Sequence, residues 1–203
     1  MPDRVAILLL AAGGSARMGR PKQFLPFEGT TLLRRAAQTA LATPCRPVVA
    51  VLGARAAESA RELAGLEIHT SENSNWPTGM GSTIKVGLRR ATELDPALDA
   101  VLLMLCDQPL ITPADLARLL EARARTSATI VATAYPGSPG VPAIFSRATF
   151  PDLLALDDAA GAKPLLLAAG ERVVTVPLPA ALTDVDTPDD YARLPARPTD
   201  PRV

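Results

Sequence analysis

The sequence has few aromatic residues, a single histidine and no excess of charge of either sign. Phe, Trp and Tyr together make up 3% of its 203 residues, so its core must be built mainly from Ala, Leu and Val. Lys and Arg total 21, and Asp and Glu also total 21. Proteins that bind nucleic acid or anionic membranes usually present a strongly basic face. We therefore expect neither nucleic acid nor a membrane as a partner.

The sequence also lacks the cysteine spacing of a metal site and any long apolar run. Its two cysteines, Cys45 and Cys106, lie far apart in the chain. The longest apolar run, from Val5 to Ala12, is too short to cross a bilayer, and Asp3 and Arg4 precede it without the pattern of a signal peptide. We expect a cytoplasmic protein with reduced thiols.

The composition that is present is that of a globular domain, with 48% hydrophobic and 21% charged residues. The chain length suits one domain, which we place at residues 1–194. The remaining stretch, residues 195–203, is rich in proline and poor in apolar side chains. We expect it to be a disordered tail.

Strand-like apolar runs alternate with helix-like amphipathic segments along most of the chain. The expected strands are residues 5–10, 47–52, 67–70, 100–105, 129–134, 141–145 and 172–177, and the expected early helices are 31–42, 56–64 and 81–93. Thr112 and Thr187, each followed by Pro and then by an acid at the third helical position, mark two further helix starts. The alternation predicts a three-layer α/β/α domain with a mostly parallel sheet and a small antiparallel portion from the later strands.

The first strand runs into a glycine turn followed by cations. Gly13 and Gly14 come directly after the apolar run, and Arg17, Arg20 and Lys22 follow without an acid among them. Glycine amides in such a turn form an anion-binding concavity, and Arg and Lys add full positive charges. This pattern favours a phosphate clamp, although a solvated surface loop is the simpler alternative. A P-loop is not matched, because Arg20-Pro21 stand where Lys-Ser/Thr is required, and no GxGxxG fingerprint occurs.

Acidic residues follow another strand and precede the last helix. Asp107 comes just after the strand 100–105, and Asp184 and Asp186 precede the helix that starts at Thr187. Ligands of open α/β sheets bind beyond the carboxyl ends of the strands, and Mg2+ prefers carboxylate, phosphate and water oxygens. We predict that Asp107 and either Asp184 or Asp186 hold Mg2+, with Asp184 favoured of the two. Alternatively, Asp107 caps its own turn and Asp186 faces the helix dipole.

Ser82 lies at the start of the predicted helix 81–93. Free amides at a helix start can hold a phosphate or contact a base, and the alternative is ordinary helix capping.

These motifs together resemble those of the MobA-like nucleotidyltransferases. The family's signature loop, L-A-[AG]-G-x-S-x-R-M-G-x-x-K-x-x-L-P, is matched at Leu10, Ala11, Ala12, Gly13, Ser15, Arg17, Met18, Gly19, Lys22, Leu25 and Pro26. Residues 73–88, 106–109 and 184–190 are similar to three further family segments, in family order. The resemblance covers about residues 4–192.

The resemblance implies a Rossmann-like nucleotidyltransferase fold and an enzyme. The Leu-Ala-Ala-Gly form of the loop is similar to that of the CTP-using molybdenum cofactor cytidylyltransferases, whereas the GTP-using enzymes usually carry Leu-Ala-Gly-Gly. The implied reaction transfers CMP from CTP to the phosphate of molybdenum-bound molybdopterin and releases pyrophosphate. A molybdenum hydroxylase is the implied recipient of the product.

The resemblance also implies roles for individual residues. Arg17, Lys22 and Asp107 would be catalytic, and Asp107, Asp184 and Asp186 would be the candidate ligands of Mg2+. The implied nucleotide-binding residues are Leu10, Ala11, Ala12, Gly13, Gly14, Ser15, Lys22, Ser82 and Asp107.

The chain departs from the family pattern mainly in its second half. Cys106 replaces the Gly of G-D-Q-P, Val141 stands where a polar residue is common, and Lys163 replaces an Arg in a shifted segment. Other readings therefore remain open: transfer to methylerythritol phosphate or a sugar phosphate, use of GTP, or a non-catalytic carrier of the molybdenum cofactor.

Overall fold

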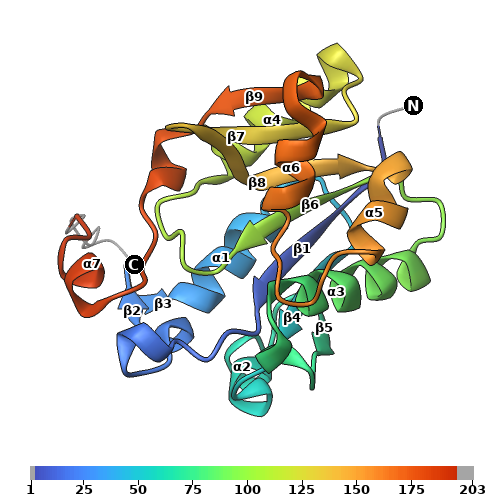
Figure 1. Ribbon diagram of the computed structural model, residues 1–203. Helices are drawn as coiled ribbons and strands as arrows, with labels where there is room; N and C mark the ends of the chain where they lie inside the picture. The colour runs from blue at the N-terminus through green and yellow to red at the C-terminus, as the bar shows by residue number, and fades with distance from the viewer. Residues whose placement is uncertain (1–2, 196–203) are drawn as a thin grey trace.

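The computed structural model describes residues 3–195, which form a seven-stranded sheet between two layers of helices (Figure 1). Across the sheet the strands are β5 (His69–Glu72), β4 (Val48–Leu52), β1 (Val5–Ala11), β6 (Ala100–Leu105), β8 (Ser138–Ser146), β7 (Ile130–Tyr135) and β9 (Val173–Pro177). Of the expected tail, only Pro195 falls within the described residues.

The sheet is mostly parallel, as the sequence predicts. Strands β1, β4, β5 and β6 pair in parallel, whereas β8 runs antiparallel to both β6 and β7. After β1 the chain builds outward through β4 and β5 and then returns to place β6 on the other side of β1. The strand order therefore reverses between β1 and β6, which is where open α/β sheets bind their ligands.

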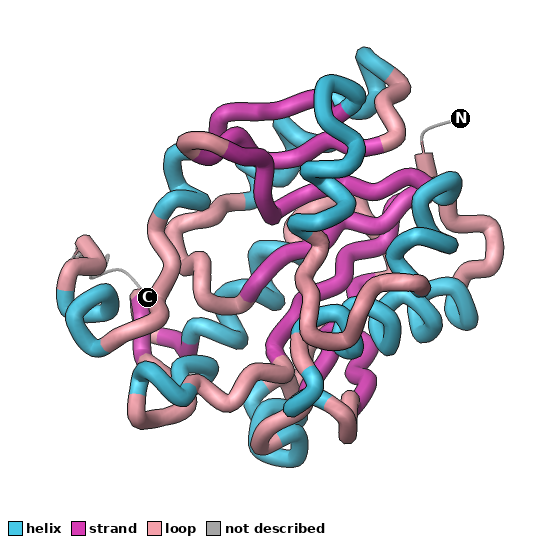
Figure 2. Tube along the Cα trace, viewed as in Figure 1, coloured by secondary structure: helices cyan, strands magenta, loops and turns pink. Residues whose placement is uncertain are grey.

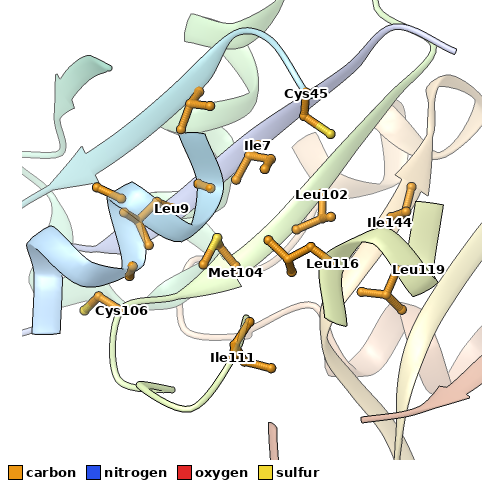
Figure 3. Packing of buried hydrophobic residues seen from close by; sticks show 14 of the residues in the cluster. Ile7, Leu9, Cys45, Leu102, Met104, Cys106, Ile111, Leu116, Leu119 and Ile144 are labelled. Atoms are coloured by element: carbon orange, nitrogen blue, oxygen red, sulfur yellow. The ribbon is translucent and has the colours of Figure 1, made fainter. Parts of the chain in front are cut away.

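Each face of the sheet is covered by its own helices (Figure 2). Each face also has its own core. Helices α1 (Leu32–Leu41), α2 (Ala56–Glu62) and α4 (Pro113–Thr126) cover one face, and α3 (Met80–Leu94), α5 (Phe150–Leu154) and α6 (Lys163–Ala169) cover the other. Side chains alternate along β1, so that Ile7 and Leu9 pack into the first core and Leu8 and Leu10 into the second. Figure 3 shows the first core, where Leu116 of α4 lies beside Leu102 of the sheet.

A small third core joins the segment that follows the glycine turn to the C-terminal segment. Val185 is fully buried with Met18, Leu25 and Phe27, against which Tyr191 also packs. The short hairpin of β2 (Pro26–Phe27) and β3 (Thr30–Thr31) thus lies beside α7 (Pro188–Ala192), as Figure 1 shows. This packing holds the segment that carries Asp184 and Asp186 close to the glycine turn.

Several element boundaries differ from those predicted. The strand expected at residues 67–70 lies at 69–72, because this edge strand keeps most of its side chains exposed and no apolar pattern marks it. The strand expected at 141–145 extends over 138–146, because residues 138–140 continue the pairing with β7. Both predicted helix starts are confirmed, because Thr112 and Thr187 each form a complete capping box.

In the part of the chain from residue 3 to 195, no helix has both the length and the apolar character that a membrane crossing requires.

Candidate active site

The carboxyl ends of β1 and β6 lie side by side, with Leu10 paired to Leu105. The glycine turn follows the first strand, and the segment that contains Asp107 follows the second. A cavity of about 280 Å³ lies between them, and its wall includes residues 10–13, Lys22, Trp76, Thr83 and Asp107. The fold therefore brings together the glycine turn and the Asp107 segment, two of the loops that the sequence predicts to be functional.

Lys22 and Asp107, which line this cavity, belong to a cluster of opposite charges. The Lys22 Nζ atom lies 2.6 Å from Asp107 Oδ2 and 2.9 Å from Asp186 Oδ1. Asp186 Oδ2 in turn lies 2.9 Å from the Arg17 guanidinium. The side chains of Lys22 and Asp107 are only 14% and 15% exposed, whereas that of Arg17 is largely in solvent. The charged side chains of Lys22, Asp107, Asp186 and Arg17 are thus linked by contacts, although they come from distant parts of the sequence.

Burial and charge shift the pKa values of these groups in different directions. Burial alone would lower the pKa of Lys22, but the charge of Asp107 and hydrogen bonds to Asp107 and Asp186 raise it above the ordinary value. Desolvation opposes ionisation of Asp186, yet Lys22 and Arg17 lower its pKa. The pKa of Asp184 is raised by desolvation first and then by the negative charge of Asp107. Lys22 is therefore a cation, and Asp184 ionises less readily than Asp186.

The acidic residues have the chemistry of a divalent-cation site. Asp107 Oδ1 is buried and has no hydrogen-bond partner among the described residues, and carboxylate oxygens are the ligands that Mg2+ and Mn2+ take. Within residues 3–195, however, no three Asp, Glu, His or Cys side chains form a ready-made metal group. The Lys22 ammonium stands between Asp107 and Asp186 instead. Of the two later aspartates, Asp186 makes the direct contact with Lys22. Asp184 was the one that the sequence favoured as the metal ligand.

The glycine turn presents unpaired amides. The backbone N–H groups of Gly13, Gly14 and Ser15 donate to none of the residues that the structure describes. Ser15 adopts the left-handed conformation, with φ 57°, as expected where a chain bends into an anion-binding nest. At Gly14 a Cβ would lie 3.0 Å from the Trp76 ring, so glycine lets the ring pack on the turn. Trp76 therefore anchors the turn by packing on it.

The start of α3 does not offer the free amides that were expected at Ser82. The amides of Gly81 and Ser82 donate to the carbonyl oxygen of Asp158, at 2.9 and 3.4 Å. The Ser82 hydroxyl donates to the Gly79 carbonyl and accepts from Asn73, and the residue is 5% exposed. Of the two alternatives for this helix start, free donors are not found at Gly81 and Ser82, because the loop at residues 157–161 packs onto it. It is the neighbouring Thr83 that lines the cavity.

Two glutamines that sequence reasoning passed over are built into the site. Gln23 is 3% exposed and hydrogen-bonds the glycine turn. Gln108 is also buried, and its Nε2 donates to the Tyr135 hydroxyl at 2.8 Å and to the Ala181 carbonyl at 3.1 Å. Each glutamine directly follows a charged residue that had been singled out. The signals in the sequence were this adjacency and, for Gln108, its place in the G-D-Q-P segment.

Tyr135 and Cys106 are both protonated next to this cluster. Burial, followed by the charge of Asp184, raises the pKa of Tyr135 to about 12. Burial, followed by the charge of Asp107, raises the pKa of Cys106 to about 12. A buried thiol in this state is a poor nucleophile.

Comparison with known proteins places this arrangement in a family. The profile of the MobA-like NTP transferase domain matches residues 7–173, which is most of the chain. The chain belongs to the MobA-like NTP transferase family. This confirms the resemblance and makes the protein a nucleotidyltransferase by family.

Two relatives of this MobA-like NTP transferase have established names. Nicotine blue oxidoreductase of Paenarthrobacter nicotinovorans is 40% identical over 115 residues, which cover 56% of the chain and 54% of the relative. The chain thus matches only about half the length of that protein. The molybdenum cofactor cytidylyltransferase of Escherichia coli is 26% identical over 187 residues, covering 91% of the chain and 92% of the relative.

Solved structures share the fold of this MobA-like NTP transferase along nearly its whole length. A nucleotidyl transferase from Methanothermobacter thermautotrophicus is 25% identical with a TM-score of 0.79, covering 94% of this chain and 95% of its own. The manganese complex of Rv0371c from Mycobacterium tuberculosis is 28% identical with a TM-score of 0.74, covering 94% and 97%. The expected Rossmann-like nucleotidyltransferase fold is therefore confirmed.

Proposed function

We propose that this protein transfers CMP from CTP to the phosphate of molybdenum-bound molybdopterin and releases pyrophosphate. The observation that carries the proposal is the convergence of Lys22, Arg17, Asp107 and Asp186 beside a glycine turn with unpaired amides. Cations and carboxylates next to free backbone amides suit a triphosphate bound with a divalent ion. The full-length similarity to the E. coli cytidylyltransferase supports the choice of CTP and of the acceptor.

The residues of the turn would bind the triphosphate. The amides of Gly13, Gly14 and Ser15 would donate to its oxygens, as amides do in phosphate-binding nests. The Ser15 hydroxyl is already engaged, because it accepts from the Lys22 amide and donates to Gln23. Ser15 would therefore contribute its backbone rather than its side chain.

Lys22 and Arg17 would offset the negative charge that develops on the leaving pyrophosphate. The raised pKa of Lys22 keeps its ammonium charged at neutral pH. The acceptor phosphate is already an anion, so the reaction needs no strong general base. The protein would align the reactants and neutralise charge, without a covalent intermediate.

Asp107, together with Asp186 or Asp184, would hold Mg2+ in this scheme. A divalent ion at these carboxylates would polarise the α-phosphate and stabilise its charge. The unpartnered Oδ1 of Asp107 supports this assignment. A related structure is a manganese complex, which supports a divalent metal without deciding between Mg2+ and Mn2+.

The remaining parts of the proposal concern where the reaction takes place and where its product goes. We propose that the protein acts in the cytoplasm, where CTP is available, and that a molybdenum hydroxylase receives the finished dinucleotide cofactor. Co-purification of the protein with such an enzyme, tested by immunoprecipitation, would address the second point.

The decisive experiment measures pyrophosphate release from each of the four ribonucleoside triphosphates with purified molybdenum cofactor and Mg2+. We expect release with CTP alone, in proportion to the acceptor consumed. Release with GTP, or with methylerythritol phosphate or a sugar phosphate as acceptor, would replace the proposed substrates while keeping the chemistry.

A non-catalytic carrier makes a different prediction. It would bind the cofactor, would still bind it after Asp107→Ala, and would release no pyrophosphate with any triphosphate. A thermal-shift comparison of CTP with GTP on the same samples reports nucleotide choice separately from turnover.

A further inference from the structure

The side chain of Gln23 spans the inside of the glycine turn. Its Nε2 donates to the Gly13 carbonyl at 2.6 Å and to the Ala11 carbonyl at 3.4 Å. Its Oε1 accepts from the Ser15 hydroxyl at 3.2 Å. A single buried amide group thus contacts the turn on both sides of Gly14.

These contacts determine which way the amides of the turn point. In a trans peptide the carbonyl of one residue and the N–H of the next point in opposite directions. Because Gln23 draws the Gly13 carbonyl inward, the Gly14 N–H points away from Gln23. The Ala12 carbonyl is fixed in the same manner by the Ala54 amide at 3.0 Å, which orients the Gly13 N–H. Glycine has no conformational preference of its own that would do this.

The same contacts extend to Lys22. The Ser15 hydroxyl that donates to Gln23 also accepts from the Lys22 backbone amide at 3.1 Å. Gln23 therefore connects the turn to the backbone of the lysine that contacts Asp107 and Asp186. If this connection is lost, both the amides and the base of the Lys22 side chain gain freedom.

We propose that Gln23 is a positioning residue that holds the glycine turn in the shape that binds the triphosphate, acting through the backbone of Gly13, Gly14 and Ser15. This inference rests on the proposed function, since it assigns the same turn to the phosphates. A turn that is already ordered loses less entropy when the ligand binds. Gln23 would thus strengthen phosphate binding without contacting the reacting atoms.

The test compares wild-type protein with Gln23→Met, which keeps the length of the side chain and removes its hydrogen bonds. We expect the Kd values for CTP with Mg2+ and for inorganic pyrophosphate to rise about tenfold, the effect of losing one or two hydrogen bonds. Trp76 is the only tryptophan and packs on Gly14, so its fluorescence reports binding directly. Gln38→Met, at an exposed position of α1, is the matched control and should change neither value.

Steady-state kinetics separate positioning from a general folding defect. Partial unfolding lowers kcat by reducing the active fraction and leaves KM unchanged, whereas a disordered turn raises the KM for CTP and leaves the acceptor KM unchanged. Gln23→Asn, which is polar but too short to bridge the turn, should show the same rise and serves if the Met variant does not fold.

The inference is overturned if folded Gln23→Met or Gln23→Asn binds pyrophosphate as tightly as wild type does. If such a variant also turns over at the wild-type rate, the proposed function is unaffected. Conversely, wild-type protein that binds CTP but turns over no acceptor would refute the proposed function, while the binding comparison would still decide the role of Gln23.

Discussion

The ammonium group of Lys22 contacts the carboxylate of Asp107 at 2.6 Å, although 85 positions separate them in the sequence. The same ammonium lies 2.9 Å from Asp186. One half-buried cation therefore contacts two carboxylates and offsets part of their charge. A divalent ion at these carboxylates would do the same, which would release Lys22 toward the phosphates.

Lys22→Met should remove activity and make the stability of the protein depend more strongly on Mg2+. Without the ammonium, Asp107 and Asp186 repel each other, so we expect the unfolding free energy to fall by about 1–3 kcal/mol. Turnover should fall by about a hundredfold or more. Calorimetry with and without Mg2+ should show a larger stabilisation by Mg2+ in the variant than in wild type.

Lys85→Met is the control for that experiment. Lys85 forms a similar ion pair with Asp158, away from the cluster, and donates to the Leu156 carbonyl. Its loss should also destabilise the protein, but Mg2+ should not restore the stability. Wild-type turnover from Lys22→Met would remove the role assigned to this lysine.

Asp107→Asn should abolish most turnover while the protein stays folded. The backbone carbonyl of Asp107, which accepts from the Val185 amide at 2.9 Å, is unaffected by the change. A neutral amide binds a divalent ion weakly, so we expect turnover to fall by about a hundredfold or more. Titration calorimetry with Mn2+ and CTP should show a matching loss of metal affinity. Asp152→Asn on the exposed surface of α5 should behave as wild type, and an unchanged Mn2+ affinity in Asp107→Asn would refute the metal assignment.

The two later aspartates should affect stability with opposite signs. The pKa of Asp184 is raised in the folded protein, so its contribution to stability is present below its unfolded pKa of about 3.9 and is lost as the pH rises through the folded pKa. Asp184→Asn should therefore raise Tm at pH 7, and the difference should shrink toward pH 4.

The pKa of Asp186 is lowered, so its contribution is present above the unfolded pKa and is lost as the pH falls through the folded pKa. Asp186→Asn should lower Tm at pH 7 and have little effect in acid. Thermal unfolding of both variants from pH 3 to 8 checks the pair. Shifts of the same sign in both variants at pH 7 would contradict the charge arrangement described here.

Val185→Ala should affect catalysis through packing alone. Val185 is fully buried in the third core. In the sequence it lies between Asp184 and Asp186. We expect about 2 kcal/mol of destabilisation from the cavity, and a larger loss of turnover than the folded fraction explains. Val131→Ala, in the first core away from the cluster, should cost similar stability without that extra loss. Equal turnover in the two variants, once corrected for folding, would show that this packing does not position the carboxylates.

Much of the local structure follows from short stretches of sequence. The first strand, the glycine turn after it and the caps at Thr112 and Thr187 were all predicted within one or two residues. Such features depend on neighbours within a few positions, through apolar periodicity, proline geometry and side-chain capping. The edge strand β5 was misplaced because its exposed side chains leave no such periodicity.

The site was predictable in its parts but not in its arrangement. The motifs around Lys22 and Asp107 identified the charged residues, whereas nothing local showed that Lys22 lies between Asp107 and Asp186. Gln23 and Ser82 illustrate the same limit. The amide of Gln23 engages the turn, and the amides at the start of α3 are taken up by the Asp158 carbonyl.

The sequence by itself determined the alternation of strands and helices, the chemistry of the loops at the strand ends and the family to which they point. The tertiary structure alone decided which charges meet, which donors remain free and which aspartate faces the lysine. The reason is physical. Periodicity and caps are set by adjacent residues, but contacts between residues 22, 107 and 186 exist only after strand order and the packing around Val185 have brought distant segments together.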